Sequence, residues 1–251
     1  MTPYFSVVIP TLNEEVNLPI LLNSIAQNQY QELEVIISDS GSKDKTKNKA
    51  MEFKDKIKNL HFLEHSSKNV SAARNFGASH AKGEFIVFFD SDVEIEQNFL
   101  IQIKDAIQKY NLDCLTVWNR SKNNKLTGRF LLNLLNASMS LFAKIKPAAN
   151  GPCIIIKRVL FEKIGGFDDT IVFGEDFDLI QKAHKLKAKF AVFKHPILYV
   201  STRRFEKEGL FLSLYKSIRA VIYQLFLGPI RKPIFEYQMG GQYYQKNKKV
   251  S

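Results

Sequence analysis

Cysteine is scarce in this chain of 251 residues, which contains only Cys114 and Cys153. Two cysteines in so long a chain exclude a disulfide framework and indicate a reducing compartment such as the cytosol. The five histidines are scattered and form no cluster with cysteine, so the sequence offers no transition-metal site of that kind. The first residues lack a basic segment followed by an apolar one, and we therefore expect no cleaved signal peptide. The chain also lacks repeats and low-complexity stretches, and its length suits one large domain or a domain with an appendage.

Negative charge is scarce in the second half of the chain. Residues 1–120 contain 13 Lys and Arg against 16 Asp and Glu, whereas residues 121–251 contain 23 against 9. The whole net charge of +11 therefore comes from the second half. A localised basic field indicates an anionic partner, either phosphates, nucleic acid or an anionic bilayer, although a merely well-solvated surface is the alternative. Only charge supports the hypothesis of a nucleic-acid-binding protein, because no recognition motif for nucleic acid occurs in the basic region.

Apolar runs alternate with helix-like segments in the first 120 residues. The strand-like runs are 4–10, 33–41, 60–65, 84–90 and 113–119, and the helix-like segments are 18–25, 43–58, 69–83 and 99–107. This alternation predicts a parallel sheet with helices on both faces, in which ligands bind beyond the carboxyl ends of the strands. Several polar residues follow predicted strands and are candidate site residues: Thr11, Asn13, Asp39, Asp90 and Asp92.

The sequence Asp90-Ser91-Asp92 directly follows the apolar run Phe85–Phe89. On an extended backbone, positions i and i+2 project to one side, so the two carboxylates could share a ligand. Such hard oxygen donors suit Mg²⁺ or Mn²⁺, with phosphates and water completing the coordination. A second Asp-x-Asp occurs at Asp176-Phe177-Asp178, so the placement after a buried strand carries more weight than the tripeptide.

Four longer stretches occur in a fixed order: VVIPTLNEEVNLPILLNSI, EVIISDSGSKDKT, SAARNFGASHAKGEFIVFFDSDV and GGFDDTIVFGEDFDL. Together they resemble glycosyltransferase family 2, whose members have the GT-A fold, a Rossmann-like α/β architecture with a mostly parallel sheet and helices on both faces. The resemblance covers roughly residues 5–205. It implies a catalytic domain at 1–205, with a nucleotide-binding half (1–120) and an acceptor half (121–205), followed by a basic amphipathic tail at 206–251.

The resemblance also implies roles for individual residues on the donor side. Asp39 would read the nucleotide base, although the family often has two adjacent Asp here and this chain has Asp39-Ser40. As an alternative or in addition, Asp39 would be a turn residue before Gly41. Asp92 would hold Mg²⁺ or Mn²⁺, and Asp90 would contact the ribose or the metal shell. The remaining nucleotide-sugar residues would be Pro10, Thr11, Asn13, Glu14, Arg74, Asn75, Ser91, Arg203 and Arg204. In the family, the Arg at the last position is paired with Trp, where this chain has Phe205.

On the acceptor side, the resemblance implies that Asp176 is the base that takes the acceptor proton, with Glu175 as the second choice. The alternative for both is a helix start that is rich in acidic residues because they complement the helix dipole. Asn150 and Gly151 would lie at the floor of the acceptor pocket.

The segment 210–227 is long and apolar but contains Lys216 and Arg219. Central cations are costly in a bilayer, so an interfacial amphipathic helix fits better than a membrane span. The apolar segment 128–147 either adds to the same surface or lines the acceptor groove; packing on the domain or on a second subunit is the alternative for both.

We therefore predict a metal-dependent, inverting glycosyltransferase of the hexosyltransferase class, peripheral to the cytoplasmic membrane face. It would use a UDP or GDP sugar and a glycan or polyprenyl-linked acceptor. An inactive family relative that serves as a membrane scaffold is the alternative.

Overall fold

The computed structural model describes residues 2–67, 69–122, 126–149 and 151–201, and within 202–251 only 209, 212, 215–216, 219–220, 223–224 and 227–235. Most of the predicted tail, including most of 210–227, therefore lies outside the described residues. Among the helices that are described, none combines the length and the apolarity needed to cross a membrane.

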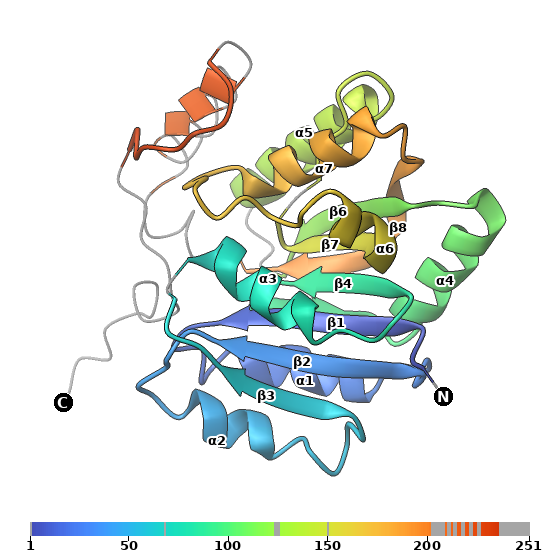
Figure 1. Ribbon diagram of the computed structural model, residues 1–251, viewed down its shortest axis with the longest axis vertical. Coiled ribbons are helices and arrows are strands. Elements are labelled where there is room, and N and C mark those ends of the chain that lie inside the picture. The colour runs from blue at the N-terminus through green and yellow to red at the C-terminus, as the bar shows by residue number, and fades with distance from the viewer. Residues whose placement is uncertain are drawn as a thin grey trace.

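A central sheet of eight strands organises the described part of the chain (Figure 1). Its spatial order is β3-β2-β1-β4-β7-β6-β8-β5. The strands are β1 (Phe5–Thr11), β2 (Leu33–Asp39), β3 (Leu60–Glu64), β4 (Phe85–Phe89), β5 (Val93–Ile95), β6 (Cys114–Ser121), β7 (Cys153–Lys157) and β8 (Phe190–Val200). The first four positions are mutually parallel, as the alternating pattern predicted. The sheet as a whole is mixed, because β7 lies antiparallel between β4 and β6, and β5 is antiparallel to β8.

Helices cover both faces of the sheet, as predicted. They are α1 (Leu18–Ala26), α2 (Thr46–Met51), α3 (Val70–Ser79), α4 (Phe99–Tyr110), α5 (Leu126–Phe142), α6 (Arg158–Lys163) and α7 (Glu175–Lys185). Alternate residues of β1 point to opposite faces: Val7 and Ile9 pack in a core with α1 and α4, and Val8 packs in a second core with α3, α6 and α7. Because both faces are covered, the inner strands are continuous apolar runs, which explains why the sequence showed them so clearly.

The helix predicted over 43–58 is shorter than expected. Regular helix ends at Met51, and turns follow it. Phe53 and Ile57 are nevertheless buried in the core, so the apolar positions that suggested a longer helix are satisfied from the turns instead.

Gly77 lets α3 approach β1 more closely than any other residue would. A Cβ atom at this position would lie 2.5 Å from Cγ1 of Val8 and 3.3 Å from Cβ of Ser38. We expect Gly77→Ala to lower the free energy of unfolding by about 1–2 kcal/mol. Overpacking a core costs about 1–3 kcal/mol, a contact as short as 2.5 Å belongs in the upper half of that range, and the better helix propensity of Ala returns about 1 kcal/mol.

Urea unfolding of the two proteins measures this difference. Ser79→Ala on the same helix is the matched control, because Ser79 is exposed and the change should be neutral or slightly stabilising. A Gly77→Ala variant as stable as the control would contradict the close contact between α3 and β1.

Candidate active site

The carboxyl ends of β1, β2 and β4 meet at one edge of the sheet, as expected for parallel neighbours (Figure 1). Thr11 and Asp39 are paired directly in the register of β1 and β2. Pro10 and Thr11 are the last two residues of β1, and both are buried. The residues that the sequence placed after these strands therefore do come together at this edge.

Asp39 uses both carboxylate oxygens in the turn that follows β2. Its Oδ2 accepts hydrogen bonds from the N–H groups of Gly41 (3.0 Å) and Ser42 (2.8 Å), and its Oδ1 accepts from the Ser42 hydroxyl (2.6 Å). The interpretation of Asp39 as a turn residue is confirmed. Contact of the same side chain with a nucleotide base stays a prediction.

The loop after β1 is fastened to the loop after β2. Asn13 has a positive φ of 53°, and its N–H donates to the Ser42 hydroxyl at 2.8 Å. The Asn13 side-chain oxygen accepts from the N–H of Lys43 at 2.8 Å, and the N–H of Glu14 donates to the Thr46 hydroxyl at 2.8 Å. These bonds join the loop after β1 to the loop after β2.

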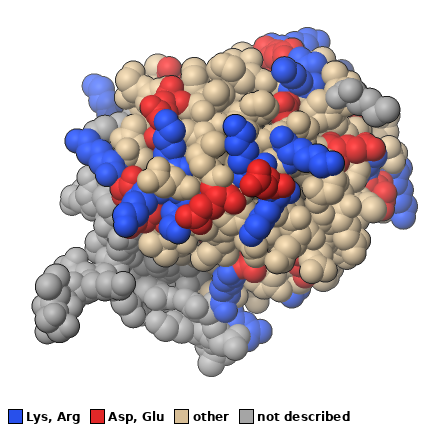
Figure 2. All heavy atoms as spheres, turned by 90° about the horizontal axis from the view of Figure 1, so that it is seen from below, with Lys and Arg blue, Asp and Glu red and all other residues tan. Residues whose placement is uncertain are grey.

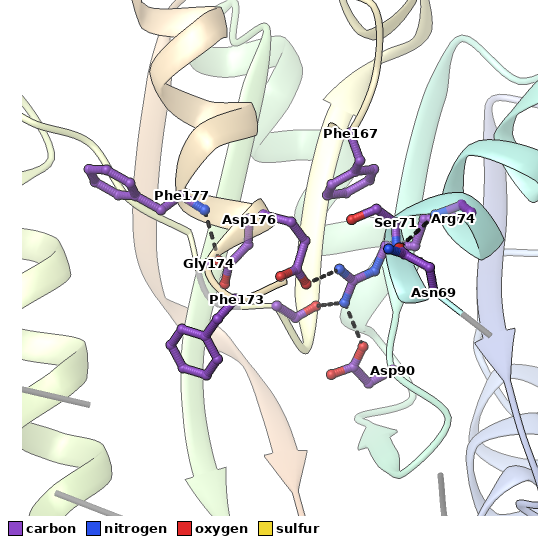
Figure 3. A network of polar contacts seen from close by, with 12 residues as sticks. Asn69, Ser71, Arg74, Asp90, Phe167, Phe173, Gly174, Asp176 and Phe177 are labelled. Atoms are coloured by element: carbon purple, nitrogen blue, oxygen red, sulfur yellow. Dashed lines mark hydrogen bonds and ion pairs between the residues drawn. The ribbon is translucent and has the colours of Figure 1, made fainter. Parts of the chain in front are cut away.

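Arg74 is the hub of a second network, drawn in Figure 3. The side chain is only 2% exposed. Its Nη1 donates to Oε1 of Glu175 at 2.7 Å, and its Nη2 donates to Oδ1 of Asp90 at 2.8 Å and to the carbonyl of Gly151 at 3.3 Å. The guanidinium also lies 5.2 Å from the centre of the Phe167 ring. One planar cation thus joins α3, the end of β4, the start of β7 and the start of α7, which a single ammonium group could not do.

The charge balance of this network explains the state of Arg74. Burial alone would lower the pKa of Arg74, but the carboxylates of Asp90, Glu175 and Asp176 outweigh burial and raise that pKa. Arg74 is therefore a fixed positive charge at the floor of the site.

Asp176 is the acidic residue whose ionisation the site changes most. Burial raises its pKa to about 7, with Glu175 acting in the same direction, while the Phe177 N–H and Arg74 oppose the rise. The Phe177 N–H donates to Oδ1 of Asp176 at 2.8 Å. Figure 3 shows Asp176 at the start of α7 with its contact to the Phe177 N–H, whereas the carboxylate of this helix that contacts Arg74 is that of Glu175. A carboxylate with a pKa near neutrality can accept and release a proton at physiological pH, which is what a general base requires.

Asp90 and Asp92 are not related as the sequence suggested. Residues 91 and 92 form a turn after β4, so the alternation of an extended strand does not apply to them. Asp90 binds Arg74, whereas Asp92 lines a cavity of about 130 Å³ together with Asn17, Lys122 and Ser201. Ser91 between them is buried.

A metal ion at these aspartates would depend on additional ligands. Within the described residues, no group of three or more His, Cys, Asp or Glu side chains could hold a metal. The oxygen chemistry of Asp90 and Asp92 does fit a hard cation such as Mg²⁺ or Mn²⁺, which keeps several positions for phosphate oxygens and water. Because Asp90 already gives Oδ1 to Arg74, the protein would supply only part of the coordination.

Asn75 binds the backbone of Phe167 through its side-chain amide, and its contact with a nucleotide sugar stays a prediction. Its side-chain nitrogen donates to the Phe167 carbonyl at 2.8 Å, and its oxygen accepts from the Phe167 N–H at 3.0 Å. These two bonds hold the loop after α6 against α3. Gly151 contributes its carbonyl to Arg74. Asn150, Arg203 and Arg204 lie outside the described residues, so their predicted roles stay predictions.

Sequence reasoning missed the C-terminal residues that brace the loop before Asp176. Ile230 is fully buried and forms a β-bridge with Phe173, and Arg231 Nη2 donates to Oδ2 of Asp168 at 2.8 Å. Arg231 also contacts Thr170. Nothing in the sequence GPIRKP indicates this contact, because it joins segments about sixty residues apart.

With this fold and site in view, the comparisons with known proteins define the class. The family model for glycosyl transferase family 2 matches residues 6–167, and the chain belongs to that family. An uncharacterized glycosyltransferase of Rickettsia prowazekii is 26% identical over 219 residues, covering 80% of this chain and 64% of the relative. A glucosyltransferase of Campylobacter jejuni that is named for a GalNAc(5)-diNAcBac-PP-undecaprenol acceptor is 36% identical over 95 residues, covering 37% of this chain and 31% of the relative. The chain thus spans less than two thirds of the length of these relatives.

The solved structures support the fold. The mannosyltransferase PcManGT from Pyrobaculum calidifontis, in complex with GDP-Man and Mn²⁺, superposes with a TM-score of 0.69 at 20% identity, covering 87% of this chain and 65% of that one. Staphylococcus aureus TarS in complex with UDP-GlcNAc superposes with a TM-score of 0.64 at 24% identity, covering 79% of this chain and 58% of that one. The predicted GT-A fold is confirmed.

Proposed function

We propose that this protein is a metal-dependent, inverting glycosyltransferase of the hexosyltransferase class that uses a nucleoside-diphosphate sugar. The observation that carries the proposal is the Asp176 carboxylate, whose pKa is raised to about 7 beside the Arg74 network, at the edge of the sheet where ligands bind in such folds. The family membership supports it, and the names of the neighbouring structures point to UDP and GDP sugars as the first donors to test.

The residues of the chain would divide the reaction between them. Asp176 would take the proton of the acceptor hydroxyl while the new glycosidic bond forms at the face opposite the departing nucleoside diphosphate. Arg74 would keep Asp90 and Glu175 in place around the site. The joined loops after β1 and β2 would bind the nucleoside, with Asn13 and Asp39 fixing their shape. Mg²⁺ or Mn²⁺, held by Asp92 and Asp90, would supply charge neutralisation for the leaving diphosphate.

A thermal-shift screen tests the donor pocket. UDP, GDP, CMP and dTDP are each added with Mn²⁺ or with EDTA. A ligand present at a hundred times its Kd stabilises the folded state by about 2.7 kcal/mol, which should raise Tm by roughly 5–10 °C for a chain of this size. We expect this rise for UDP or GDP with Mn²⁺, and we expect EDTA to remove it.

Asp92→Asn should abolish the metal-dependent rise without changing Tm of the free protein. Asp105→Asn is the matched control, because Asp105 is exposed on α4. A rise of unchanged size in Asp92→Asn would remove Asp92 from the metal site. If no nucleotide shifts Tm of the folded wild type, the proposal of a donor pocket fails and the scaffold reading gains weight.

We also propose a location at the cytoplasmic face of the membrane and a glycan or polyprenyl-linked acceptor. Two observations support this part of the proposal. Residues 179–251 contain 15 Lys and Arg against 3 Asp and Glu, which suits anionic headgroups. The Campylobacter jejuni relative carries an undecaprenol-linked acceptor in its name.

A further inference from the structure

Helix α5 is apolar on two opposite faces. Its inner face contributes Leu132 and Met139, which are 5% and 7% exposed, and Asn136, which is fully buried and exchanges two hydrogen bonds with the backbone of Asn119 in β6. These residues recur every three or four positions and fix which side of the helix faces the sheet. The side opposite to them should therefore be polar if it only faced water.

The outer face is not polar. Phe130, Leu134 and Leu141 are 71%, 53% and 74% exposed, and they recur at intervals of four and seven residues, so they form one row along the helix. Phe142, the last residue of α5, and Ile145 in the turn after it lie at the carboxyl end of the row and are 50% and 77% exposed. We call these five residues the α5 stripe. Single exposed apolar side chains are ordinary on a protein surface, but a continuous row of five large ones marks an interaction surface.

The segment of chain that carries the α5 stripe has charged side chains of one sign only. No Asp or Glu occurs between Asp113 and Glu162, whereas eight Lys and Arg do, among them Arg129 and Lys144 beside the stripe. The face shown in Figure 2, which lies at the α2 and β3 end of the molecule, is different: basic and acidic side chains alternate there. Lys47 pairs with Glu64 and Lys49 with Glu52 on this mixed face.

An apolar row on a segment that carries basic and no acidic side chains favours one class of partner. The apolar side chains can enter the boundary between headgroups and acyl chains, while the lysines and arginines remain among anionic headgroups. A second copy of this chain is disfavoured, because it would bring two surfaces of the same positive sign together.

The α5 stripe ends beside the candidate active site. Lys146, one residue beyond Ile145, lies 5.6 Å from the centre of the Phe177 ring, and Gln181 of α7 donates to the Pro147 carbonyl at 2.5 Å. The N–H of Phe177 in turn binds Asp176. A bilayer in contact with the stripe would therefore lie next to the base that the proposed reaction uses.

We infer that the α5 stripe is the surface by which this protein docks on an anionic lipid bilayer, an inference that rests on the proposed membrane location and assigns it to particular residues. Docking along α5 presents the start of α7 to an acceptor whose lipid part stays in the membrane. The membrane contact is thus made by the acceptor half of the catalytic domain, in addition to any contribution from the basic tail.

Vesicle flotation with the full chain tests this inference. The probes are vesicles of phosphatidylcholine alone and of phosphatidylcholine mixed with phosphatidylglycerol. We expect wild type to float with the anionic vesicles, to stay unbound with the neutral ones, and to bind less as salt is raised. The double variant Leu134→Asn/Leu141→Asn should bind anionic vesicles at least about tenfold more weakly, because two side chains lose their burial in the bilayer.

The matched control is Val159→Asn/Leu186→Asn, which removes two exposed apolar side chains, 57% and 47% exposed, from α6 and from the turn after α7. This control should bind like wild type, and all three proteins should have the same Tm. Unchanged binding of the α5 variant would overturn the inference, as would a wild type that binds neither kind of vesicle. A wild-type dimer in light scattering that the α5 variant abolishes, without vesicle binding, would also overturn it in favour of self-association.

The nucleotide thermal shift separates this test from that of the proposed function. It uses soluble ligands and no vesicles, so the α5 variant should retain the full shift. Loss of vesicle binding with a retained shift supports the inference, whereas loss of both in the variant would mean that the substitutions disturb the site and would count against a separate docking surface.

Discussion

Replacing Arg74 with Met is expected to lower the free energy of unfolding by about 3 kcal/mol at pH 8. Breaking a buried ion pair by removing one partner costs roughly 3–5 kcal/mol, because the remaining charge is left uncompensated. Glu175 is 15% exposed and Asp90 is 33% exposed, so water screens part of this cost and we expect the lower end of the range. Denaturant unfolding of both proteins at the same pH measures the difference.

The pH dependence of this loss distinguishes charge from packing. Without the guanidinium, the pKa of Asp176 should rise further in the folded state, because Arg74 opposes its rise in wild type. A group whose folded pKa is raised costs stability as pH rises through that pKa, so the deficit of Arg74→Met should be larger at pH 8 than at pH 5. A deficit that is the same at both pH values would show that the lost side chain acted mainly through packing against Phe167.

Two further variants test whether Arg74 acts through its charge and through its pairing with Glu175. Arg74→Lys keeps the charge but cannot direct separate N–H groups at Glu175 and Asp90, so it should recover only part of the stability. Adding Glu175→Gln to Arg74→Met removes one of the uncompensated charges and should restore part of the loss. If the loss of unfolding free energy in the double variant equals the sum of the losses in the two single variants, Arg74 and Glu175 are not coupled and the network assigned to Arg74 is wrong.

The strands that end at the site could be predicted because their signal lies within a few consecutive residues. β1, β2 and β4 are buried on both faces, so their apolar runs stand out without knowledge of the fold. The turn role of Asp39 could be predicted for the same reason, since its partners lie two and three residues ahead. β7 was missed, and its antiparallel insertion between β4 and β6 depends on contacts between segments more than sixty residues apart in the chain.

The site beyond these strands could be predicted only in part. The resemblance to the family named Arg74, Asp90, Glu175 and Asp176 as site residues. No local sequence pattern predicts that the guanidinium of Arg74 bridges Asp90 and Glu175, which is 101 positions away from Arg74. The geometry assumed for Asp92 was wrong because the strand ends at Phe89 and a turn follows. Asn75 is another such case, because its amide binds the backbone of Phe167, 92 residues further along the chain.

Asp176→Asn is expected to reduce the rate of sugar transfer by about 10²–10⁴-fold while making the protein more stable at pH 8. General-base catalysis contributes a factor of that size, and Asn cannot accept the proton. The stability gain follows from the pKa of Asp176, which is raised to about 7 because the folded protein disfavours its ionised form. Wild type therefore loses stability as pH rises from about 4, the ordinary Asp pKa, to about 7, and Asn does not. The gain should be full above pH 7 and should vanish below about pH 4.

Rate and stability are measured on the same preparations. The rate is the release of nucleoside diphosphate from the donor that the thermal-shift screen selects, followed from pH 5 to pH 9. Wild type should become faster as pH rises through about 7, and Asp176→Asn should lack this rise. Glu175→Gln is the control, because Glu175 shares the first turn of α7 but is bound to Arg74. If Glu175→Gln instead loses the pH dependence and Asp176→Asn keeps it, the base is Glu175. If Asp176→Asn is both slower and less stable at pH 8, the carboxylate supports the fold. A catalytic carboxylate whose ionised form the folded protein disfavours should instead give a more stable protein when its charge is removed.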